Sequence, residues 1–264
     1  GGDRGGGVGC GGGRCAERRP YIEIAIWTKP GPFPRSLATK TLSDSIRVTS
    51  VVRVLTKGRD KARRVSKVEV LAGKGSWRER LSGFTMGISA PSFFQVNTAT
   101  AERLVSTAVD ALDPSEDDVV LDCYSGAGTF TLKLAERSDD VVAIEASSAA
   151  IQDLRRNLEN AGLHEDIVGG YATRELPELG EFDRILVDPP RAGLTPEALK
   201  ALSSAGASRI VYVSCDPATL ARDAGALDAQ GYALTRVTPV DLFPQTYHVE
   251  SVAVFDRSQP STPT

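Results

Sequence analysis

The sequence lacks any apolar run near the roughly 18 residues needed to span a bilayer, and it lacks a signal-peptide core. It has only two histidines, His164 and His248, which disfavours a histidine-based metal site. Its four cysteines do not form the spaced framework of a disulfide-rich protein; they are Cys10, Cys15, Cys123 and Cys215. These absences predict a cytoplasmic, intracellular protein with no membrane partner.

Charge is also nearly balanced, with a net value of −3 over 264 residues, so composition gives no global signal for nucleic acid. The basic residues are nevertheless uneven, because seven of them lie within residues 53–67 against a single acid, Asp60. They are Arg53, Lys57, Arg59, Lys61, Arg63, Arg64 and Lys67. Such a segment could neutralise phosphates, or it could be the solvated tip of a hairpin.

Changes of pattern divide the chain into four parts. Residues 1–19 are rich in Gly and Arg, so we expect disorder there and a chain that begins inside a longer protein. Residues 20–88 contain strand-like alternation, as in YIEIAIW, and predict a small β-rich unit with a possible RNA contact. Residues 89–257 alternate strands with helices, and residues 258–264 form a tail.

The part from 89 to 257 predicts an α/β fold. A helical pattern over 97–112 begins at Asn97, a suitable N-cap. Four continuous apolar strands each precede a further helix; they are VVLDCY, VVAIEA, RILVDPP and RIVYVSCDP. This alternation is typical of a doubly wound, mostly parallel sheet with helices on both faces. The last two strands, YALTRVTPVDLF and ESVAVFDR, predict an antiparallel pair at one edge.

Three strand ends carry the signal for a ligand. Gly126 and Gly128 follow the first strand and allow a tight turn that a ligand can approach closely. Glu145 ends the second strand, where an acid can accept hydrogen bonds from ribose hydroxyls. Asp188 ends the third strand before two prolines, which hold the chain outside the sheet. The pattern departs from G-x-G-x-x-G at Thr131, so it favours a nucleoside cofactor other than a dinucleotide.

Two further residues have the chemistry of a nucleophile and a base. Cys215 ends the fourth strand beside a helix that Asp216 would cap, and the helix N-terminus should lower the pKa of its thiol. Glu250 precedes the last apolar run, where partial desolvation should raise the pKa of its carboxyl. Cys123 lies within a buried strand and is expected to be a packing residue, and His248 a hydrogen-bonded loop residue.

Six motifs, in this order, resemble those of the RNA (uracil-5-)-methyltransferase family, the class I enzymes that make 5-methyluridine in tRNA and 23S rRNA. They are SFFQVN at 92–97, DCYSGAGTF, VVAIEAS, DPPRAG, VSCDPATLARD and DLFPQTYHVE, and the similarity covers roughly residues 46–257. The resemblance implies a seven-stranded Rossmann-like fold, S-adenosyl-L-methionine as cofactor and RNA as partner. The final motif leans slightly toward tRNA. Nothing indicates an oligomer, so we expect a monomer.

The resemblance also assigns roles to residues. The cofactor site would be lined by Gln95, Tyr124, Gly126, Gly128, Thr129, Glu145 and Asp188. Cys215 would be the nucleophile that adds to uracil C6, and Glu250 the base that removes the C5 proton. We expect RNA contacts from Arg59, Lys61, Arg63, Arg64 and Arg191. The scheme requires no metal, and the base must leave its stack to reach the pocket.

Two departures from the family and three alternatives stay open. The N-terminal β-barrel of many members is missing, and Cys10 and Cys15 do not match the cluster cysteines, so an iron–sulfur cluster is not expected. A cytosine-5 methyltransferase would share the thiol chemistry, but its Pro-Cys motif is missing. An adenine N6 or guanine N2 methyltransferase would need neither Cys215 nor Glu250. A non-catalytic RNA-binding module is the third alternative.

Overall fold

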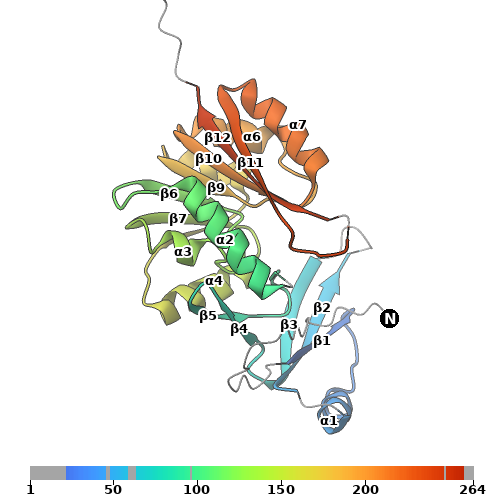
Figure 1. The fold of residues 1–264 in the computed structure, drawn as a ribbon. Helices are drawn as coiled ribbons and strands as arrows, with labels where there is room; N and C mark the ends of the chain where they lie inside the picture. The colour runs from blue at the N-terminus through green and yellow to red at the C-terminus, as the bar shows by residue number, and fades with distance from the viewer. Residues whose placement is uncertain (1–21, 46–47, 59–63, 96, 247, 259–264) are drawn as a thin grey trace, which may run out of the picture.

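The computed structural model describes residues 22–45, 48–58, 64–95, 97–246 and 248–258. Its N-terminal part is a three-stranded sheet of order β1-β2-β3 with one helix. The elements are β1 (Glu23–Thr28), α1 (Arg35–Ser45), β2 (Ser50–Lys57) and β3 (Arg64–Gly73). Strand β1 runs parallel to β2, and β2 runs antiparallel to β3, so α1 is the crossover between two parallel strands (Figure 1).

Helix α1 is not predicted by the sequence pattern, which indicates only strands in this part. The reason is that α1 has no apolar face, and none of its residues is buried. Arg53 also differs from expectation. It is 2% exposed, and its guanidinium donates hydrogen bonds to Thr28 Oγ1 at 2.8 Å and to two loop carbonyls while lying over the ring of Phe33. Arg53 therefore fastens the loop after β1, and it is not available to neutralise a phosphate.

A two-stranded hairpin, β4 (Trp77–Leu81) and β5 (Phe84–Ile88), connects this sheet to the rest of the chain. Its buried residues Leu81, Met86 and Ile88 belong to the same apolar cluster as the helices that follow. Strand β5 packs along α4 and β4 packs against α2, as Figure 1 shows. The hairpin is thus held by the larger α/β part of the chain.

The α/β part is built on a seven-stranded sheet of order β11-β12-β10-β9-β6-β7-β8. Its strands are β6 (Val119–Cys123), β7 (Asp140–Glu145), β8 (Asp166–Gly169), β9 (Arg184–Val187), β10 (Arg209–Ser214), β11 (Tyr232–Val240) and β12 (Glu250–Arg257). Only β12 runs against the others, since it pairs antiparallel with both β10 and β11. The predicted doubly wound sheet and its closing antiparallel pair are confirmed.

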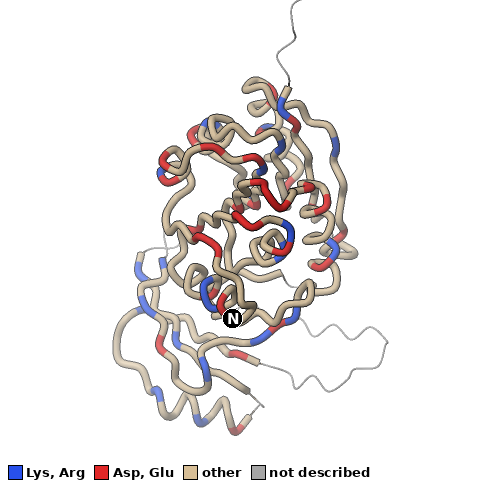
Figure 2. The backbone as a smooth tube through the Cα atoms, turned by 90° about the vertical axis from the view of Figure 1, so that its left-hand side faces the viewer, with Lys and Arg blue, Asp and Glu red and all other residues tan. Residues whose placement is uncertain are grey.

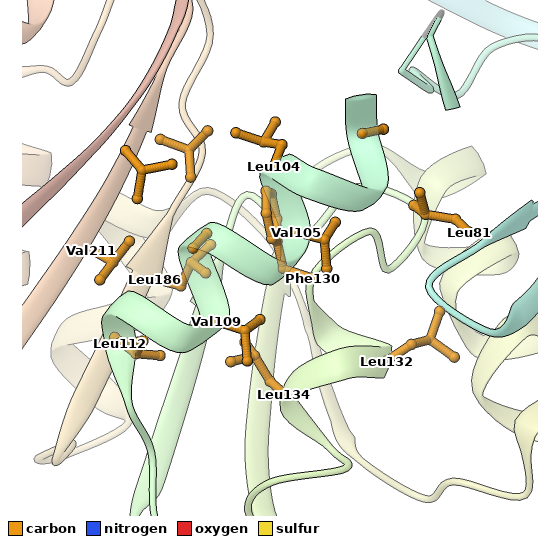
Figure 3. Close-up of a cluster of buried hydrophobic side chains, with 14 of the residues drawn as sticks. Leu81, Leu104, Val105, Val109, Leu112, Phe130, Leu132, Leu134, Leu186 and Val211 are labelled. Carbon is orange, nitrogen blue, oxygen red and sulfur yellow. The ribbon is translucent and has the colours of Figure 1, made fainter. Parts of the chain in front are cut away.

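Helices cover both faces of this sheet, as predicted. The elements are α2 (Thr98–Leu112), α3 (Thr131–Leu134), α4 (Ser148–Ala161), α5 (Ala172–Glu175), the 3-10 turn η2 (Leu176–Glu178), α6 (Pro196–Ser204) and α7 (Pro217–Asp228). One core cluster joins α2, α3 and α4 to the sheet, and a second joins α5, α6 and α7 to its other face. Figure 3 shows Leu104, Val105 and Val109 of α2 within the first cluster.

Several local predictions can be compared with the structure. Asn97 caps α2 through Thr100 N–H, and Asp216 caps α7 through the N–H groups of Ala218 and Thr219. Helix α3 is shorter than the predicted segment 128–137, because Gly128 adopts a φ of +96° and the turn continues to Phe130. Strand β8 and helix α5, four residues each, are too short to show a period and were not predicted.

Candidate active site

The carboxyl ends of the parallel strands meet at one edge of the sheet, and the start of β12 reaches the same edge because β12 runs antiparallel. This edge holds Asp122 and Glu145 at the ends of β6 and β7, Asp188 just after β9, and Cys215 just after β10. Glu250 begins β12. Residues from five separate strands therefore share one edge, where α/β folds bind their ligands. All of them except Asp122 were predicted as site residues from the sequence.

Cys215 and Glu250 are brought together by the pairing of β10 with β12. The last registered pair in this ladder is Ser214 with Ser251. Cys215 follows Ser214 directly and Glu250 precedes Ser251 directly, so both residues lie at the same end of the ladder. The charge of Glu250 acts on the thiol of Cys215, which places the carboxylate within electrostatic range of the sulfur.

The electrostatics of the pair differ from the sequence-based expectation in one respect. Burial, followed by the charge of Glu250, raises the pKa of the Cys215 thiol, and Arg191 opposes this increase. The expected lowering by the helix N-terminus is thus wrong, because desolvation and a nearby carboxylate outweigh the helix dipole. Burial also raises the pKa of the Glu250 carboxyl, as predicted for a residue that is only 5% exposed.

Arg191 is the cation at this edge. Its positive charge lowers the pKa of both the Cys215 thiol and the Glu250 carboxyl. The guanidinium lies 3.1 Å from Nδ1 of His248, whose ring makes an edge-to-face contact with Phe243. His248 is thus a hydrogen-bonded loop residue, as predicted. Arg191, which the sequence suggests only as an RNA contact, interacts electrostatically with the nucleophile and base candidates.

The glycine turn after β6 is fastened to Glu145. One carboxylate oxygen accepts from Gly126 N–H at 2.9 Å and the other from Ser147 N–H at 2.6 Å. A Cβ added at Gly126 would meet no atom within 4 Å, so there is open space beside the turn. Tyr124 adopts a φ of +67°, a strained value for a bulky residue. The N–H groups of Tyr124 and Ser125 share the carbonyl of Ile144, which supports that conformation.

Two buried oxygens of residues in the family-like motifs have no hydrogen-bond partner within the described part of the chain: Oε1 of Gln95 and Oδ1 of Asp122. Burial raises the pKa of Asp122 to about 7, against the hydrogen bond from Thr131, and nearby Glu145 adds to the increase. Burial together with Glu250 and Asp122 also raises the pKa of Asp188 well above its usual range. Unpaired buried acceptors are costly, and a ligand donor would satisfy them.

Sequence reasoning gave Asp122 no role, although the residue opens the glycine motif. It likewise missed the contacts that hold the loop after β9. The carboxylate of Asp223 on α7 accepts from Leu194 N–H at 2.8 Å and from the Tyr212 hydroxyl at 2.7 Å, and Arg222 donates to the carbonyls of Ala192 and Leu194. The only sequence signal was the ARD tripeptide of the VSCDPATLARD motif. Residues 222–223 therefore anchor the loop that carries Arg191.

The remaining predicted residues are placed as follows. Thr129 is half-buried within the glycine turn, and Cys123 is fully buried, as expected of a packing residue. Phe93, two residues before Gln95, is 70% exposed. Arg64 is exposed at the start of β3, whereas Arg59, Lys61 and Arg63, like Cys10 and Cys15, lie outside the described residues. Basic residues predominate over the β1–β3 unit and acidic residues over the α/β part (Figure 2).

Comparison with known proteins gives two family matches. Residues 175–258 match the tRNA (uracil-5-)-methyltransferase family, and residues 89–168 match the ribosomal RNA adenine dimethylase family. The first segment contains Asp188, Cys215 and Glu250. The second contains the glycine turn and Glu145 but ends before those three residues.

The individual relatives are named as RNA methyltransferases, and one of them has a name that agrees with the first match. A Pyrococcus abyssi tRNA (uracil-54, C5)-methyltransferase, solved with S-adenosyl-L-homocysteine, is 32% identical with a TM-score of 0.70, covering 90% of this chain and 57% of that one. An RNA methyltransferase of Streptococcus mutans is 39% identical over 228 residues, which are 83% of this chain and 50% of the relative. One of Chlorobaculum tepidum is 42% identical over 197 residues, 72% and 41%. The chain spans about half the length of these relatives. Within the described residues no helix is long and apolar enough to cross a membrane.

Proposed function

We propose that this chain, whose residues 175–258 match the tRNA (uracil-5-)-methyltransferase family model, methylates C5 of a uridine in RNA with S-adenosyl-L-methionine. The observation that carries the proposal is the position of Cys215 and Glu250 at one end of the β10–β12 ladder, where the charge of Glu250 acts on the Cys215 thiol. A covalent mechanism needs a nucleophile and a base that reach the same pyrimidine ring, and this end of the ladder supports such a pair.

The nucleophile in this proposal is Sγ of Cys215. Uracil C5 is a weak nucleophile, so the thiolate first adds to C6, and the electron pair of the C5–C6 double bond moves into an enolate. Because burial and Glu250 raise the pKa of the thiol, it is protonated in the resting site at neutral pH. Arg191 lowers that pKa and therefore favours the thiolate. Arg191 thus promotes the nucleophilic attack of Cys215 on C6.

The base is the carboxylate of Glu250. The enolate carbon C5 accepts the methyl group that bound S-adenosyl-L-methionine supplies, and C5 then carries both a methyl group and a proton. Glu250 accepts this proton, the electron pair restores the C5–C6 double bond, and the thiolate leaves C6. Burial raises the pKa of Glu250 and strengthens it as a base. The thiol proton passes to solvent water before the attack, and transfer of the methyl group breaks its bond to the sulfonium sulfur and leaves S-adenosyl-L-homocysteine. The C5 proton passes to Glu250.

The residues present fit a nucleoside cofactor that carries positive charge. Within the described residues, Oε1 of Gln95 and Oδ1 of Asp122 are buried acceptors without partners, and the ammonium group of a ligand could donate to them. Asp188 adds a carboxyl at the same edge, and Tyr124 and Thr129 belong to the turn beside it. Glu145 is the acceptor proposed for the ribose hydroxyls, with Gly126 and Gly128 shaping the turn.

The match of residues 89–168 to an adenine dimethylase does not support a second function. That segment carries the glycine turn and Glu145, which any S-adenosyl-L-methionine-dependent enzyme of this fold needs. It contains neither Cys215 nor Glu250, and methylation of an exocyclic amine has no use for a nucleophilic thiol. We therefore propose uridine as the target, with tRNA as the first RNA to test.

The deciding experiment uses 5-fluorouridine-containing tRNA transcript and S-adenosyl-L-methionine. Fluorine at C5 cannot be removed as a proton, so we expect an RNA adduct that survives denaturation with the wild-type protein. The adduct should be absent in Cys215→Ala and retained in Cys123→Ala, which removes a buried thiol from the same chain. Adduct formation in Cys215→Ala, or methylated adenine in nuclease digests, would overturn the proposal.

A second variant tests the base. With ordinary uridine-containing tRNA, Glu250→Gln should slow product release by about 10²- to 10⁴-fold, the usual contribution of general base catalysis. The methylated RNA should then accumulate as a covalent adduct on Cys215, visible as a shifted band on a denaturing gel. A variant that turns over at the wild-type rate would exclude Glu250 as the base.

A further inference from the structure

A cavity of about 770 Å³ lies between the β4–β5 hairpin and the second half of α4, outside the catalytic edge. Figure 1 shows these two elements side by side. Its lining includes Lys74, Arg78 and Arg156, and no Asp or Glu is among the lining residues. The hairpin contributes Arg78 from its outward face, opposite Gly87 in the β4–β5 register. Three cations therefore converge on one hollow from three segments of the chain.

Two of these cations have no carboxylate partner in the described part of the chain. Within the described residues, neither Lys74 nor Arg78 has a carboxylate at ion-pair distance, and both side chains are exposed. Unpaired basic groups around a concave surface concentrate positive potential there. The cavity is thus complementary to an anion.

The third cation is held in a fixed position. The guanidinium of Arg156 donates to the carbonyl of Gly87 at 2.7 Å and also pairs with the buried carboxylate of Asp153. A Cβ at residue 87 would lie 2.9 Å from Nε of Arg156, so glycine allows the guanidinium to lie against β5. That Nε–H is buried and has no hydrogen-bond partner in the described part of the chain. An anion in the cavity would supply the acceptor that the protein does not.

We propose that this cavity binds a phosphate group of the RNA backbone through Lys74, Arg78 and Arg156. The inference rests on the proposed function, because RNA is the substrate assigned there. Helix α4 begins three residues after Glu145, and Arg156 lies eight residues further along it. That separation is roughly 12 Å at about 1.5 Å per residue along the helix, so one RNA strand could contact both places. A phosphate bound there would fix the register of the RNA while a flipped base occupies the catalytic edge.

The test compares two double variants that each remove two exposed cations. Lys74→Gln with Arg78→Gln removes the unpaired charges of the cavity and leaves Arg156, which supports β5, in place. Lys200→Gln with Arg236→Gln is the matched control, on α6 and on β11 at the opposite edge of the sheet from β8. Affinity for unmodified tRNA transcript is measured from about 50 to 200 mM salt, the range over which phosphate contacts dominate binding.

We expect the slope of log affinity against log salt to fall by roughly 0.7–0.9 in the cavity variant, which is the change for the loss of one phosphate contact. The control variant should keep the wild-type slope. An unchanged slope in the cavity variant, or an equal fall in both variants, would overturn the inference. A third outcome would also overturn it: inorganic phosphate stabilises the wild-type protein against unfolding but not the cavity variant, while the salt slope for tRNA binding is the same in both. The cavity would then bind only the free anion.

Failure of the inference can be told apart from failure of the proposed function. The same proteins are assayed for the 5-fluorouridine adduct at saturating tRNA, which depends on Cys215 and not on the cavity. If the adduct forms and the salt slopes of all variants are unchanged, the methyltransferase proposal is supported and the phosphate site is refuted. If the slope falls in the cavity variant and wild-type protein forms no adduct, the phosphate site is supported and the proposed reaction is refuted.

Discussion

The hydroxyl of Thr131 donates a hydrogen bond of 2.5 Å to Oδ2 of Asp122, while Oδ1 of the same buried carboxyl has no partner within the described residues. Hydrogen bonds from the side chain and the backbone of Thr131 do not offset the loss of hydration, so burial raises the pKa of Asp122 from 3.8 to about 7. The folded protein thus holds a proton on Asp122 that the unfolded chain releases at lower pH. Stability and ligand binding are linked through this one group.

The sign of the effect follows from the direction of the shift. Between pH 3.8 and about 7 the folded state binds more protons than the unfolded state, so the free energy of unfolding falls as the pH rises. Asp122→Asn removes the titration. Relative to wild type, the variant should gain up to about 4 kcal/mol between about pH 4 and about pH 8, from three pK steps of about 1.4 kcal/mol each. Urea unfolding of both proteins at the two pH values measures this difference in the free energy of unfolding.

The control for this prediction is Asp228→Asn, which changes an exposed acid at the end of α7. It should leave the pH dependence of wild type unaltered. Asp122→Asn should also weaken binding of S-adenosyl-L-homocysteine in calorimetric titration, because an amide is a poorer acceptor for an ammonium group than a carboxylate. Parallel stability curves for wild type and Asp122→Asn would contradict the assignment.

Arg191 should set the pH dependence of the covalent step. Its charge lowers the pKa of the Cys215 thiol, so Arg191→Gln raises that pKa and reduces the thiolate present at neutral pH. Adduct formation with 5-fluorouridine tRNA should slow by roughly tenfold at neutral pH, equivalent to about 1.4 kcal/mol. The rate should recover as the pH increases, because the thiol then ionises without the cation.

Rapid-quench measurements over a pH series test this prediction, with Arg191→Lys as the charge-conserving comparison. Lysine should restore part of the neutral-pH rate. A uniform loss at every pH in Arg191→Gln would show that the residue binds RNA without affecting the thiol.

The sequence predicted the strands and the edge residues because their signals are local. An apolar run ending in Asp-Pro-Pro or Ser-Cys-Asp-Pro identifies a buried strand and the residue at its end, and parallel strands bring such ends to one edge. The candidate pair Cys215 and Glu250 could therefore be named before any coordinates. What the pattern did not supply was the electrostatic balance, since the pKa of Cys215 depends on Glu250 and Arg191, which are distant in sequence.

Other features were hidden because they depend on tertiary partners. Arg53 reads as one of seven surface cations, yet a loop more than 20 residues earlier supplies the carbonyls and the ring that bury it. Helix α1 lacks the apolar periodicity that would reveal it. The positive φ of Tyr124 is likewise unreadable, because tyrosine gives no signal for a left-handed conformation.

The Asp223 contacts should be essential for the loop that presents Arg191. Asp223→Ala leaves the Tyr212 hydroxyl and the Leu194 amide buried without an acceptor, which should cost roughly 2–4 kcal/mol of unfolding free energy. Tyr212→Phe removes one of the two donors and should cost only about 1 kcal/mol. Urea unfolding gives both values.

A purely structural role would lower stability without altering the catalytic constants of the folded protein. We expect Asp223→Ala to reduce kcat by a larger factor than it increases the KM for S-adenosyl-L-methionine. The reason is that the loop would no longer hold Arg191 near the Cys215 thiol. Equal costs for the two variants, or unchanged kcat in the folded fraction, would contradict the anchoring role.

Asn157 connects the β4–β5 hairpin to the glycine turn. Its Oδ1 accepts from Gly87 N–H at 2.7 Å and its Nδ2 donates to the carbonyl of Ala127 at 2.9 Å. Asn157→Ala leaves both backbone groups unpaired in the interior, so unfolding free energy should fall by roughly 2–3 kcal/mol. Because Ala127 belongs to the glycine turn, which is part of the proposed cofactor site, affinity for S-adenosyl-L-homocysteine should fall as well. The expected decrease is about tenfold for each 1.4 kcal/mol of binding free energy that is lost.

The matched control is Asn160→Ala, which removes the same side chain one helical turn further along α4 where it is exposed. Surface substitutions of this kind change stability by about 0.5 kcal/mol or less. Chemical unfolding and calorimetric titration of both variants separate the two residues. Since Gly87 also lies against Arg156, Asn157→Ala should in addition weaken tRNA binding at low salt without changing the number of phosphates contacted. An Asn157→Ala protein with wild-type cofactor affinity would show that the hairpin and the turn are mechanically independent.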